Sequence, residues 1–376
     1  MEKYDVAIVG GGIIGLAQAW RAASRGLQVA LFERDSRASG ASIRNFGMIW
    51  PIGQNAGEPY ETACESAALW RELGEQNVLQ VEECGALHLA HREDELAVLQ
   101  EFVGLQTHQC EMLSAEETCR RSQLANPSGL LGAMWSPTEL RADPRIASAN
   151  IAAWLHSRYS VQFSFGTPVT HVESGNLHCS GGQRVLADRI VICSGSDLRT
   201  LYPKVLDQSG LKLCKLQMLK AKVSAAKASA EEPAPHLASG LTLRHYTSFQ
   251  GCQALETLKQ RVAAESPELD EYGIHVMASQ FPSGDVILGD SHEYGADIAP
   301  FDKSEIDDYM IRELRGLIQL EDWTITQRWH GIYAKHSEKT IFQAEPDPGV
   351  FVFVGPGGAG MTMSFGLAER AWKQWD

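Results

Sequence analysis

The stretch that decides the fold is residues 5–33, DVAIVGGGIIGLAQAWRAASRGLQVALFE. Residues 5–9 form a short apolar run that is typical of a buried parallel strand. The alanine-rich residues 16–24 predict a helix, and residues 28–32 predict a second buried strand. Between the first strand and the helix, three glycines stand in the spacing G-x-G-x-x-G: Gly10, Gly12 and Gly15. The stretch therefore predicts the strand–turn–helix–strand unit of an α/β fold.

Each glycine of this turn has a physical role. Gly10 permits a tight turn, Gly12 lets a pyrophosphate approach the backbone, and Gly15 lets helix and strand pack closely. The free N–H groups and positive dipole end of the helix N-terminus favour negative charge. Glu33, 23 positions after Gly10, is placed to accept hydrogen bonds from ribose hydroxyls. Strand, helix, second strand and acid together predict a dinucleotide site, for either NAD or FAD.

A second glycine-rich turn lies near the other end of the chain. Residues 350–354 (VFVFV) predict another buried strand, and a closing helix is expected to reach about Trp372. Backbone N–H groups in such a turn can meet a second electron-rich part of a cofactor, which in a flavin is the N1–C2=O edge. The turn between strand and helix contributes these candidate cofactor ligands: Gly355, Gly357, Gly358, Ala359, Gly360, Met361 and Thr362.

Length, charge and cysteine usage exclude several classes of function. The chain has 376 residues, enough for two domains, and 33 Lys and Arg against 47 Asp and Glu give a net charge of −14. This balance argues against nucleic acid or an anionic membrane as partner. Eight cysteines without a C-x-x-C pair predict reduced thiols and no metal site. No apolar run approaches membrane-spanning length, and the first strand begins almost at the N-terminus, so we expect no signal peptide and a cytoplasmic location.

The chain resembles, over essentially its whole length, the FAD-dependent amine and amino acid oxidases that include glycine oxidase, sarcosine oxidase and D-amino acid oxidase. The matching pieces are residues 10–15, Glu33-Arg34, residues 40–42 and 46–48, residues 167–169, the expected strand 190–193 before Ser194-Gly195, and the C-terminal glycine turn. The resemblance implies FAD as cofactor. It also implies non-covalent binding, because residues 329–336 lack the cysteine that tethers the flavin in sarcosine oxidases.

The resemblance also implies which residues contact the cofactor. In such proteins residues 42–48 would wrap FAD beside the flavin ring, Val169 would lie against the adenosine half, and residues 355–362 would meet the isoalloxazine. The further cofactor ligands that it implies are Ile13, Ile14, Arg34, Ala41, Ser42, Arg44, Asn45, Phe46, Gly47, Met48, Ser194, Gly195 and Gly331.

We expect a discontinuous FAD-binding domain of Rossmann type and an α+β substrate domain built on an antiparallel sheet. The predicted FAD-binding domain comprises residues 1–79, 141–210 and 326–376, and the substrate domain residues 80–140 and 211–325. Asp143 and Pro144 predict the N-cap and first residue of a helix that reaches about Arg158.

Further helices are expected over residues 58–79, 93–106, 114–122 and 302–320, and further strands over residues 161–165, 169–173 and 324–333. Residues 211–223 predict a long antiparallel strand with a bulge near Cys214, whose Lys215, Lys220 and Lys222 form a solvated face. Residues 275–281 and 285–289 predict a hairpin, and residues 225–235 a surface loop.

Flavin amine oxidation needs orientation and electrostatics more than acid–base side chains. The first substrate-facing candidate is His292, since sarcosine-oxidase-like relatives carry such a histidine at about this place. Those relatives also carry, just upstream, a lysine linked to oxygen activation. Here the nearby residues are Val286, Ile287 and Leu288, so fast reaction with oxygen is not implied.

The second candidate is the run 329–336. In glycine oxidase-like members an arginine of this run clamps the substrate carboxylate, whereas this chain has Tyr333, followed by Lys335 and His336. Tyr333, Lys335 and His336 can each donate a single hydrogen bond to an anion. Such separate donors suit a tetrahedral phosphonate at least as well as the planar guanidinium of an arginine does. Arg44 and Asn45 form the third candidate. Other substrate-domain residues, for which a structural role is the commoner one, are His88, His91 and Arg244-His245-Tyr246.

Our leading hypothesis is FAD-dependent oxidation of a small anionic amine, with 2-aminoethylphosphonate or an N-methylated form as substrate. Short motifs of the chain resemble a branch of the family found with aminophosphonate degradation. Hydride passes to the flavin, the imine hydrolyses to an aldehyde and an amine or ammonia, and oxygen or another acceptor reoxidises the flavin. The alternatives are a glycine, sarcosine or D-amino acid oxidase, a flavoprotein acting on tRNA, and a non-catalytic FAD-binding scaffold.

Overall fold

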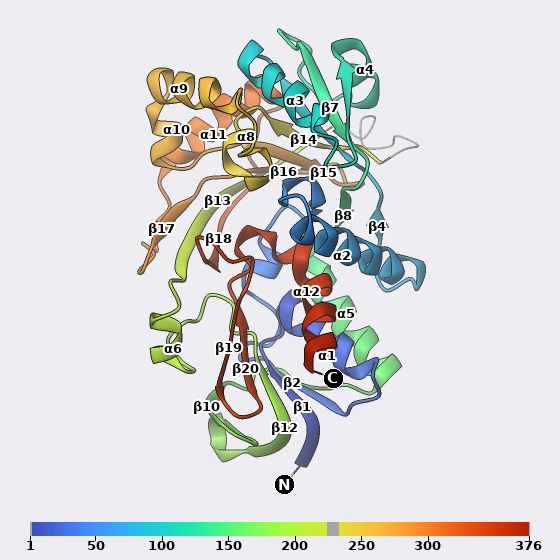
Figure 1. Ribbon diagram of the computed structural model, residues 1–376, viewed down its shortest axis with the longest axis vertical. Coiled ribbons are helices and arrows are strands. Elements are labelled where there is room, and N and C mark those ends of the chain that lie inside the picture. Colours follow the sequence, from blue (N-terminus) through green and yellow to red (C-terminus); the bar gives the residue numbers. More distant parts are fainter. Residues whose placement is uncertain (1, 224–232, 376) are drawn as a thin grey trace.

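The computed structural model describes residues 2–223 and 233–375, and most of the predicted surface loop 225–235 lies outside these ranges. Two large sheets dominate the described chain, one in the lower and one in the upper half of Figure 1. Both ends of the chain lie in the lower half. The mixed α/β class expected from the sequence is confirmed.

The lower sheet has a parallel centre. β1 pairs in parallel with β2 and β12, β2 with β9, and β12 with β20, while β10, β11 and β19 add antiparallel edges. This pairing confirms the predicted strand–turn–helix–strand unit. The strands are β1 (Glu2–Val9), β2 (Val29–Phe32), β9 (Gln162–Ser164), β10 (Val169–Glu173), β11 (Asn176–Cys179), β12 (Arg184–Ile192), β19 (Phe342–Asp347) and β20 (Val350–Val354).

Helices with aromatic faces pack together beside this sheet (Figure 1). Trp20 is fully buried, with ring centres 5.2 Å from Trp154 and 5.1 Å from Phe365. The Asp143 carboxylate accepts a hydrogen bond of 2.9 Å from the backbone N–H of Arg145, which confirms the predicted N-cap. The helices of this half are α1 (Ile13–Ala23), α2 (Glu58–Glu75), α5 (Pro144–Tyr159), α6 (Pro203–Asp207) and α12 (Gly360–Trp375).

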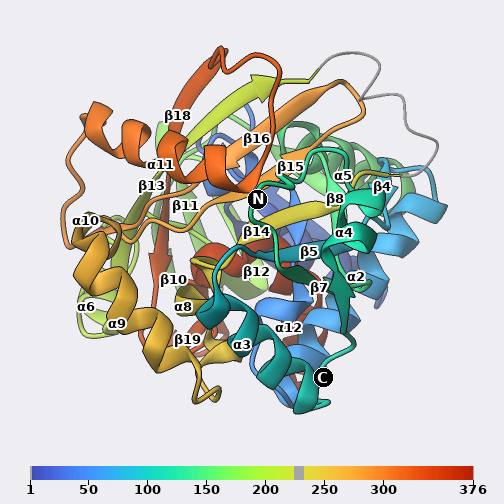
Figure 2. The ribbon, with the colours of Figure 1, turned by 90° about the horizontal axis from the view of Figure 1, so that it is seen from above.

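The upper sheet is mainly antiparallel, and Figure 2 shows it from above with helices around it. Its strands are β5 (Ala86–Ala90), β6 (Glu111–Ser114), β7 (Gly132–Ser136), β13 (Lys212–Lys222), β14 (His236–Ser239), β15 (Met277–Gln280), β16 (Asp285–Gly289), β17 (Glu293–Gly295) and β18 (Gln327–Lys335). Its helices are α3 (Glu93–Gly104), α4 (Ala115–Arg121), α8 (Thr242–His245), α9 (Leu255–Glu265), α10 (Pro267–Glu271) and α11 (Ser304–Leu317). The antiparallel pairing of β15 with β16 confirms the predicted hairpin.

Two predictions for strand β13 are wrong. Its pairing with β18 runs without a register shift from Lys212 to Lys220, so there is no bulge at Cys214. Lys215 is not solvated: it is 1% exposed, and its ammonium lies 2.9 Å from a carboxylate oxygen of Asp302. Helix α11 contacts the strand, while Leu216 and Met218 line a cavity on the strand's other side. Burial of both faces explains why the polar–apolar alternation was irregular.

The other two lysines of β13 that were predicted to be solvated, Lys220 and Lys222, differ from each other in exposure. Lys220, with a side chain 11% exposed, lies 3.3 Å from Asp285, and only Lys222 of the three predicted solvated lysines is well exposed. Partnered lysines in a buried strand are a tertiary effect, because their carboxylates come from β16 and from the segment before α11. The sequence of the strand alone does not contain those partners.

Short elements complete the described fold. A small sheet is formed by β3 (Met48–Ile49), β4 (Val81–Glu82) and β8 (Leu140–Ala142), and 3-10 helices by residues Ala41–Ile43, Pro51–Gly53, Ser180–Gly182, Thr247–Phe249 and Gly357–Ala359. Strand β18 begins just after residue 326, where the predicted FAD-binding domain resumes, and it is hydrogen-bonded to β13 in the upper sheet. The predicted division of the chain into two domains stays a prediction. Among the described residues, no helix combines the length and apolar character that crossing a bilayer requires.

Candidate active site

A cavity of about 570 Å³ is lined by residues from both large sheets. This volume falls in the range of small-molecule and cofactor sites. The predicted cofactor ligands that line it are Gly10, Gly12, Ile13, Ile14, Glu33, Arg34, Ala41, Ser42, Arg44, Asn45, Phe46, Met48, Val169, Ser194, Gly195, Gly331, Gly355, Gly357, Gly358, Ala359, Gly360, Met361 and Thr362. The catalytic candidates His292, Tyr333, Lys335 and His336 line the same cavity.

The first glycine turn is closed to side chains by its own geometry. Gly10 has φ +107°, and a Cβ there would overlap the backbone carbonyl of Cys193. A Cβ at Gly15 would overlap the carbonyl oxygen of Gly10, so Gly15 serves packing and does not line the cavity. Gly47, also absent from the lining, has φ +75° and lies against the Ala142 carbonyl. The backbone itself forms this end of the site.

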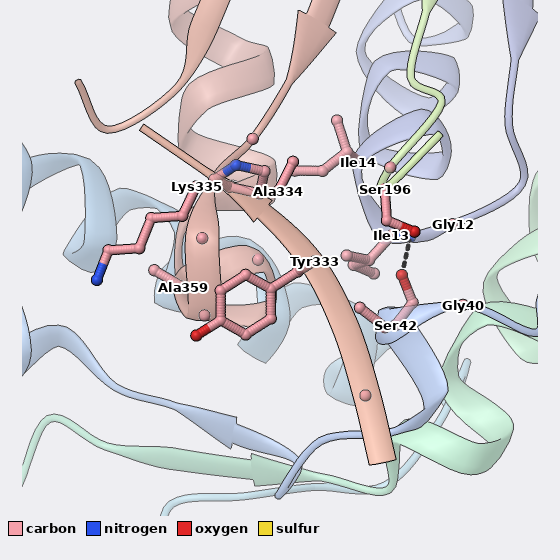
Figure 3. A pocket seen from close by; sticks show the side chains of 18 of the residues that line it. Gly12, Ile13, Ile14, Gly40, Ser42, Ser196, Tyr333, Ala334, Lys335 and Ala359 are labelled. Carbon is pink, nitrogen blue, oxygen red and sulfur yellow. Dashed lines mark hydrogen bonds between the residues drawn. The ribbon is translucent and has the colours of Figure 1, made fainter. Parts of the chain in front are cut away.

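The N-terminus of α1 is partly satisfied by the neighbouring loop. The Ser42 hydroxyl oxygen accepts a hydrogen bond of 2.9 Å from the backbone N–H of Ile13, and both residues lie at the cavity in Figure 3. A Cβ at Gly12 would approach this hydroxyl to 3.0 Å. Positive partial charge at a helix N-terminus favours an anionic ligand such as a pyrophosphate.

Glu33 is held in place by two backbone groups. One carboxylate oxygen accepts a hydrogen bond of 2.7 Å from the N–H of Gly11, and the other accepts one of 2.9 Å from the N–H of Asp35. The residue is 9% exposed and lines the cavity. Each carboxylate oxygen keeps a free acceptor position for a ribose hydroxyl, which agrees with the predicted role.

The loop after Gly40 is shaped by Asn45. Its amide nitrogen donates hydrogen bonds of 3.0 Å to the carbonyls of Ala41 and Ser42, and its oxygen accepts one of 2.8 Å from the N–H of Gly47. These bonds give Asn45 a role in loop geometry, and its predicted contact with substrate stays a prediction. Arg44 lies 3.4 Å from the His330 carbonyl and lines the cavity.

The C-terminal glycine turn lies against strand β18. A Cβ at Gly358 would lie 3.4 Å from the Tyr333 hydroxyl, and a Cβ at Gly357 would lie 3.2 Å from the Lys335 side chain. Tyr333 and Lys335 are two residues apart on a strand and therefore share one face. Figure 3 shows both side chains leaving the strand on the same side, with Ala359 close by. The Tyr333 phenol and the Lys335 amine thus lie beside the C-terminal glycine turn.

Burial disfavours the charged form of both groups. It raises the pKa of Tyr333 well above its ordinary value, so the phenol stays protonated and can donate a hydrogen bond to a ligand. It lowers the pKa of Lys335, whose ammonium lies 3.5 Å from the Tyr294 hydroxyl. His336 accepts hydrogen bonds at Nδ1 from the N–H groups of Glu338 and Lys339, so its Nε2 carries the proton.

Three histidines also line the cavity: His245, His275 and His292. Burial lowers the pKa of His292 to about 4 and the pKa values of His245 and His275 well below their ordinary value, so all three are uncharged at neutral pH. Burial raises the pKa of Asp290 well above its ordinary value. His292 was expected here from the sequence.

The sequence missed the neighbours of His292. His275 was seen only as the start of a strand, Asp290 only as part of a motif, and His245 and Tyr246 were assigned a commoner structural role, yet all line the cavity. They come from separate segments of the chain, and no spacing pattern links them. His88 and His91, which the sequence analysis grouped with His245, do not line the cavity. The sequence therefore did not distinguish histidines that line the cavity from histidines that do not.

A parallel sheet with a G-x-G-x-x-G turn, and a second glycine turn at the same cavity, define the class of FAD-binding oxidoreductases. Backbone that leaves room for phosphates, an acid at the ribose position and a helix N-terminus fit this cofactor. The chain matches the family model described as FAD dependent oxidoreductase (DAO) over residues 5–372, and it belongs to that family. The resemblance noted in the sequence is thereby confirmed.

Individual relatives are more distant. The chain is 24% identical over 243 residues to a subunit of the opine oxidase of Rhizobium meliloti, covering 58% of this chain and 63% of that protein. It is 29% identical over 213 residues to glycine oxidase of Geobacillus kaustophilus (strain HTA426), covering 52% and 55%. The matches thus span less than two thirds of these relatives' own length. The crystal structure of glycine oxidase from Geobacillus kaustophilus shares the fold, with a TM-score of 0.76, 19% identity, and coverage of 100% of this chain and 94% of that one.

Proposed function

We propose that the protein oxidises a small anionic amine with FAD, and that 2-aminoethylphosphonate or an N-methylated form is the substrate. The observation that carries the proposal is the pair Tyr333 and Lys335 on one face of β18, beside the C-terminal glycine turn. A protonated phenol and a half-buried amine are separate point donors, and they suit a tetrahedral anion. Tyr333 stands where the resemblance places a carboxylate-clamping arginine.

The electrostatics of the cavity support an anionic substrate. Lys335 is half-buried, and desolvation lowers its pKa. An anion beside a buried amine favours the charged form and reverses part of this shift. Arg44 also lines the cavity. A protein of net charge −14 therefore presents local cationic groups where the proposed substrate would lie.

The reaction needs a hydride acceptor and an uncharged amine. When bound, FAD accepts the hydride equivalent from the carbon next to nitrogen. As the hydride leaves carbon and a proton leaves nitrogen, the C–N bond becomes C=N. Water then hydrolyses the imine to an aldehyde and an amine or ammonia. The chain's own part is to bind the anion with Tyr333 and Lys335 and to keep the amine end, at His292, uncharged.

The proposal also covers the electron acceptor and the cellular location. Oxygen or another acceptor would reoxidise the flavin, and Ile287 and its neighbours in β16 stand where the family's oxygen-activating lysine would be. All eight cysteines are unpaired, which supports a reducing cytoplasm as the location. We propose neither a nucleic acid nor a membrane as partner.

A glycine, sarcosine or D-amino acid oxidase is the second candidate, favoured by the names of two relatives, opine oxidase and glycine oxidase. Turnover with oxygen and with an artificial acceptor separates the two candidates. The substrates to compare are 2-aminoethylphosphonate, its N-methyl form, glycine, sarcosine and D-alanine, with the carbonyl product identified. Turnover of phosphonates with release of phosphonoacetaldehyde is expected. Turnover confined to the amino acids contradicts the phosphonate proposal.

A further inference from the structure

Three imidazoles and one carboxylate meet in the lining of the cavity. His245 ends helix α8, His275 precedes β15, and Asp290 and His292 follow β16. The ring centres are 3.9 Å apart for His245 and His275, 4.4 Å for His245 and His292, and 4.9 Å for His275 and His292. One ring nitrogen from each histidine lies within 4.8 Å of the others.

The hydrogen bond of His292 orients its free nitrogen. Its Nδ1 lies 3.1 Å from the carbonyl oxygen of Gly273, which can only accept, so Nδ1 carries the proton and Nε2 has a lone pair. Histidine ligands of metal ions commonly donate their other N–H to a backbone carbonyl in this way. The lone pair of Nε2 faces Asp290, whose carboxylate oxygen is 3.8 Å away.

His275 and Asp290 have unpartnered polar atoms. His275 is 3% exposed, and neither of its ring nitrogens has a hydrogen-bond partner. Asp290 is 6% exposed, and its Oδ1 lacks a partner as well. Buried polar atoms in native proteins are nearly always paired. Of these atoms, His275 Nε2 lies near Asp290 Oδ1, which points to a ligand that both could bind.

The separations suit ligands of one ion better than a hydrogen bond. His275 Nε2 is 3.6 Å from Asp290 Oδ1, and His292 Nε2 is 3.8 Å from Asp290 Oδ2. Hydrogen bonds of this kind are roughly 2.7–3.2 Å long. Two ligand atoms each about 2.0–2.2 Å from a common ion lie roughly 3.3–3.8 Å apart at tetrahedral to trigonal angles.

We propose that His245, His275, His292 and Asp290 bind a divalent first-row transition metal ion. Imidazole nitrogen and carboxylate oxygen are ligands that such ions share, and zinc is the appropriate redox-inactive probe. The four residues also line the cavity, so one coordination position of the ion would face it. His292 would then act on the substrate through the ion. Only this last step rests on the proposed function.

A metal ion at this place would differ from the expectation of no metal site, which stays a prediction. That expectation came from cysteine spacing, whereas these ligands are histidines and an aspartate from different segments. The described chain also carries a surface pair, the exposed His171 and the partly buried His178, with Nε2 atoms 3.9 and 3.7 Å from carboxylate oxygens of Glu173. This surface pair is a source of adventitious binding, so it supplies the matched control.

The test is calorimetric titration of chelator-treated, FAD-loaded protein with zinc chloride, without substrate. We expect one tight site per chain in the wild type and in His178→Gln. In His275→Leu and His292→Gln we expect affinity to fall at least by the roughly 10–100-fold that loss of an outer-shell partner costs. Unchanged flavin content and circular dichroism show that the variants are folded. Binding that only His178→Gln removes, an adventitious ion only, overturns the proposal.

A second measurement does not depend on the variants. Electron paramagnetic resonance of the wild type with one equivalent of Cu²⁺ should show superhyperfine coupling to several imidazole nitrogens, because oxidised flavin is diamagnetic. A spectrum without nitrogen coupling, or with a coupling pattern that stays the same as in the wild type in both His245→Gln and His275→Leu, contradicts the assignment. Failure of either metal test leaves the amine turnover result unaffected, and turnover confined to amino acids leaves the metal result unaffected.

Discussion

The cofactor end and the substrate end of the cavity differ in what lines them, backbone in one case and side chains in the other. At the cofactor end the lining is largely backbone, through Gly10 and Gly12 in one turn and Gly357 and Gly358 in the other. At the substrate end the lining includes side chains from segments far apart in the chain, as His245, His275 and His292, with Asp290 beside the last two, show. The difference decides what a sequence can reveal about each end.

A backbone site needs a contiguous motif. The glycines must follow one another at fixed spacing between a strand and a helix, so the motif is visible in the chain itself. A side-chain site needs only that its members meet in space. His245 and His275 are 30 positions apart, and no periodicity joins them. Substitutions should therefore have sharp, local effects at the cofactor end and distributed effects at the substrate end.

The largest expected effect is at the cofactor end. Gly10→Ala places a Cβ against the Cys193 carbonyl at φ +107°. We expect FAD affinity to fall roughly a hundredfold or more, equivalent to about 3 kcal/mol, because the backbone has to move where the phosphates lie. Equilibrium titration of apoprotein with FAD measures it. Gly26→Ala, at φ +80° with open space around it, should retain full FAD affinity; equal loss in both variants contradicts the backbone account.

The second largest effect is expected for Lys335, which lies between the cofactor end and the substrate end of the cavity. Lys335→Met removes the cation beside the C-terminal glycine turn, and loss of a charged hydrogen bond costs about 1.5–3 kcal/mol. We expect kcat/KM for an anionic amine to fall roughly 10–150-fold, mainly through KM, with FAD content unchanged. Steady-state kinetics measures it. Lys222→Met, exposed at the end of β13 opposite to the end that pairs with Lys335, should be unaffected; an unchanged KM in Lys335→Met removes that lysine from the anion site.

A third prediction separates cavity histidines from core histidines. His88 is fully buried, and burial lowers its pKa to about 3. Unfolded histidine titrates near 6.5, so below this pH the unfolded state binds the extra proton and stability falls as pH falls from about 6.5 toward 3. Above pH 6.5 both states are neutral and the effect vanishes. The slope from this one residue is about 1.4 kcal/mol per pH unit.

Urea unfolding at pH 7.5, 6 and 5 measures this slope. His88→Leu should flatten it by that amount while keeping FAD affinity and turnover unchanged, since His88 does not line the cavity. His236, whose pKa burial also lowers to about 3, keeps its own contribution in the variant. An identical pH dependence in wild type and His88→Leu contradicts the assignment of His88 as a neutral core residue.

The smallest effect concerns the helix cap. Ser42→Ala removes the hydroxyl that accepts the Ile13 N–H, and loss of such a cap costs about 1 kcal/mol. We expect the unfolding free energy to fall by that amount and FAD to bind a few-fold more weakly. Chemical denaturation of the apoprotein and FAD titration measure the two. Ser39→Ala, in the same loop but without a bond to the helix, is the comparison; a larger effect there shows that loop stiffness, and not the cap, matters.

The elements that were predicted correctly depend on local chemistry. The Asp143 cap, the hairpin 275–289 and the two glycine turns each contain their own signal within a few residues. Lys215 was misplaced because its partner Asp302 is 87 positions away. His275 and Asp290 were missed for the same reason. What the sequence could not supply in each case was the identity of the tertiary neighbour.

The most direct test of amine oxidation at this cavity is anaerobic mixing of the FAD-loaded protein with amines while the flavin absorbance is followed. We expect 2-aminoethylphosphonate or its N-methyl form to bleach the flavin at concentrations where ethylamine, of similar length but without the anion, does not. Bleaching by glycine, sarcosine or D-alanine alone contradicts the proposed substrate. No bleaching by any of these amines contradicts the proposed amine oxidation itself.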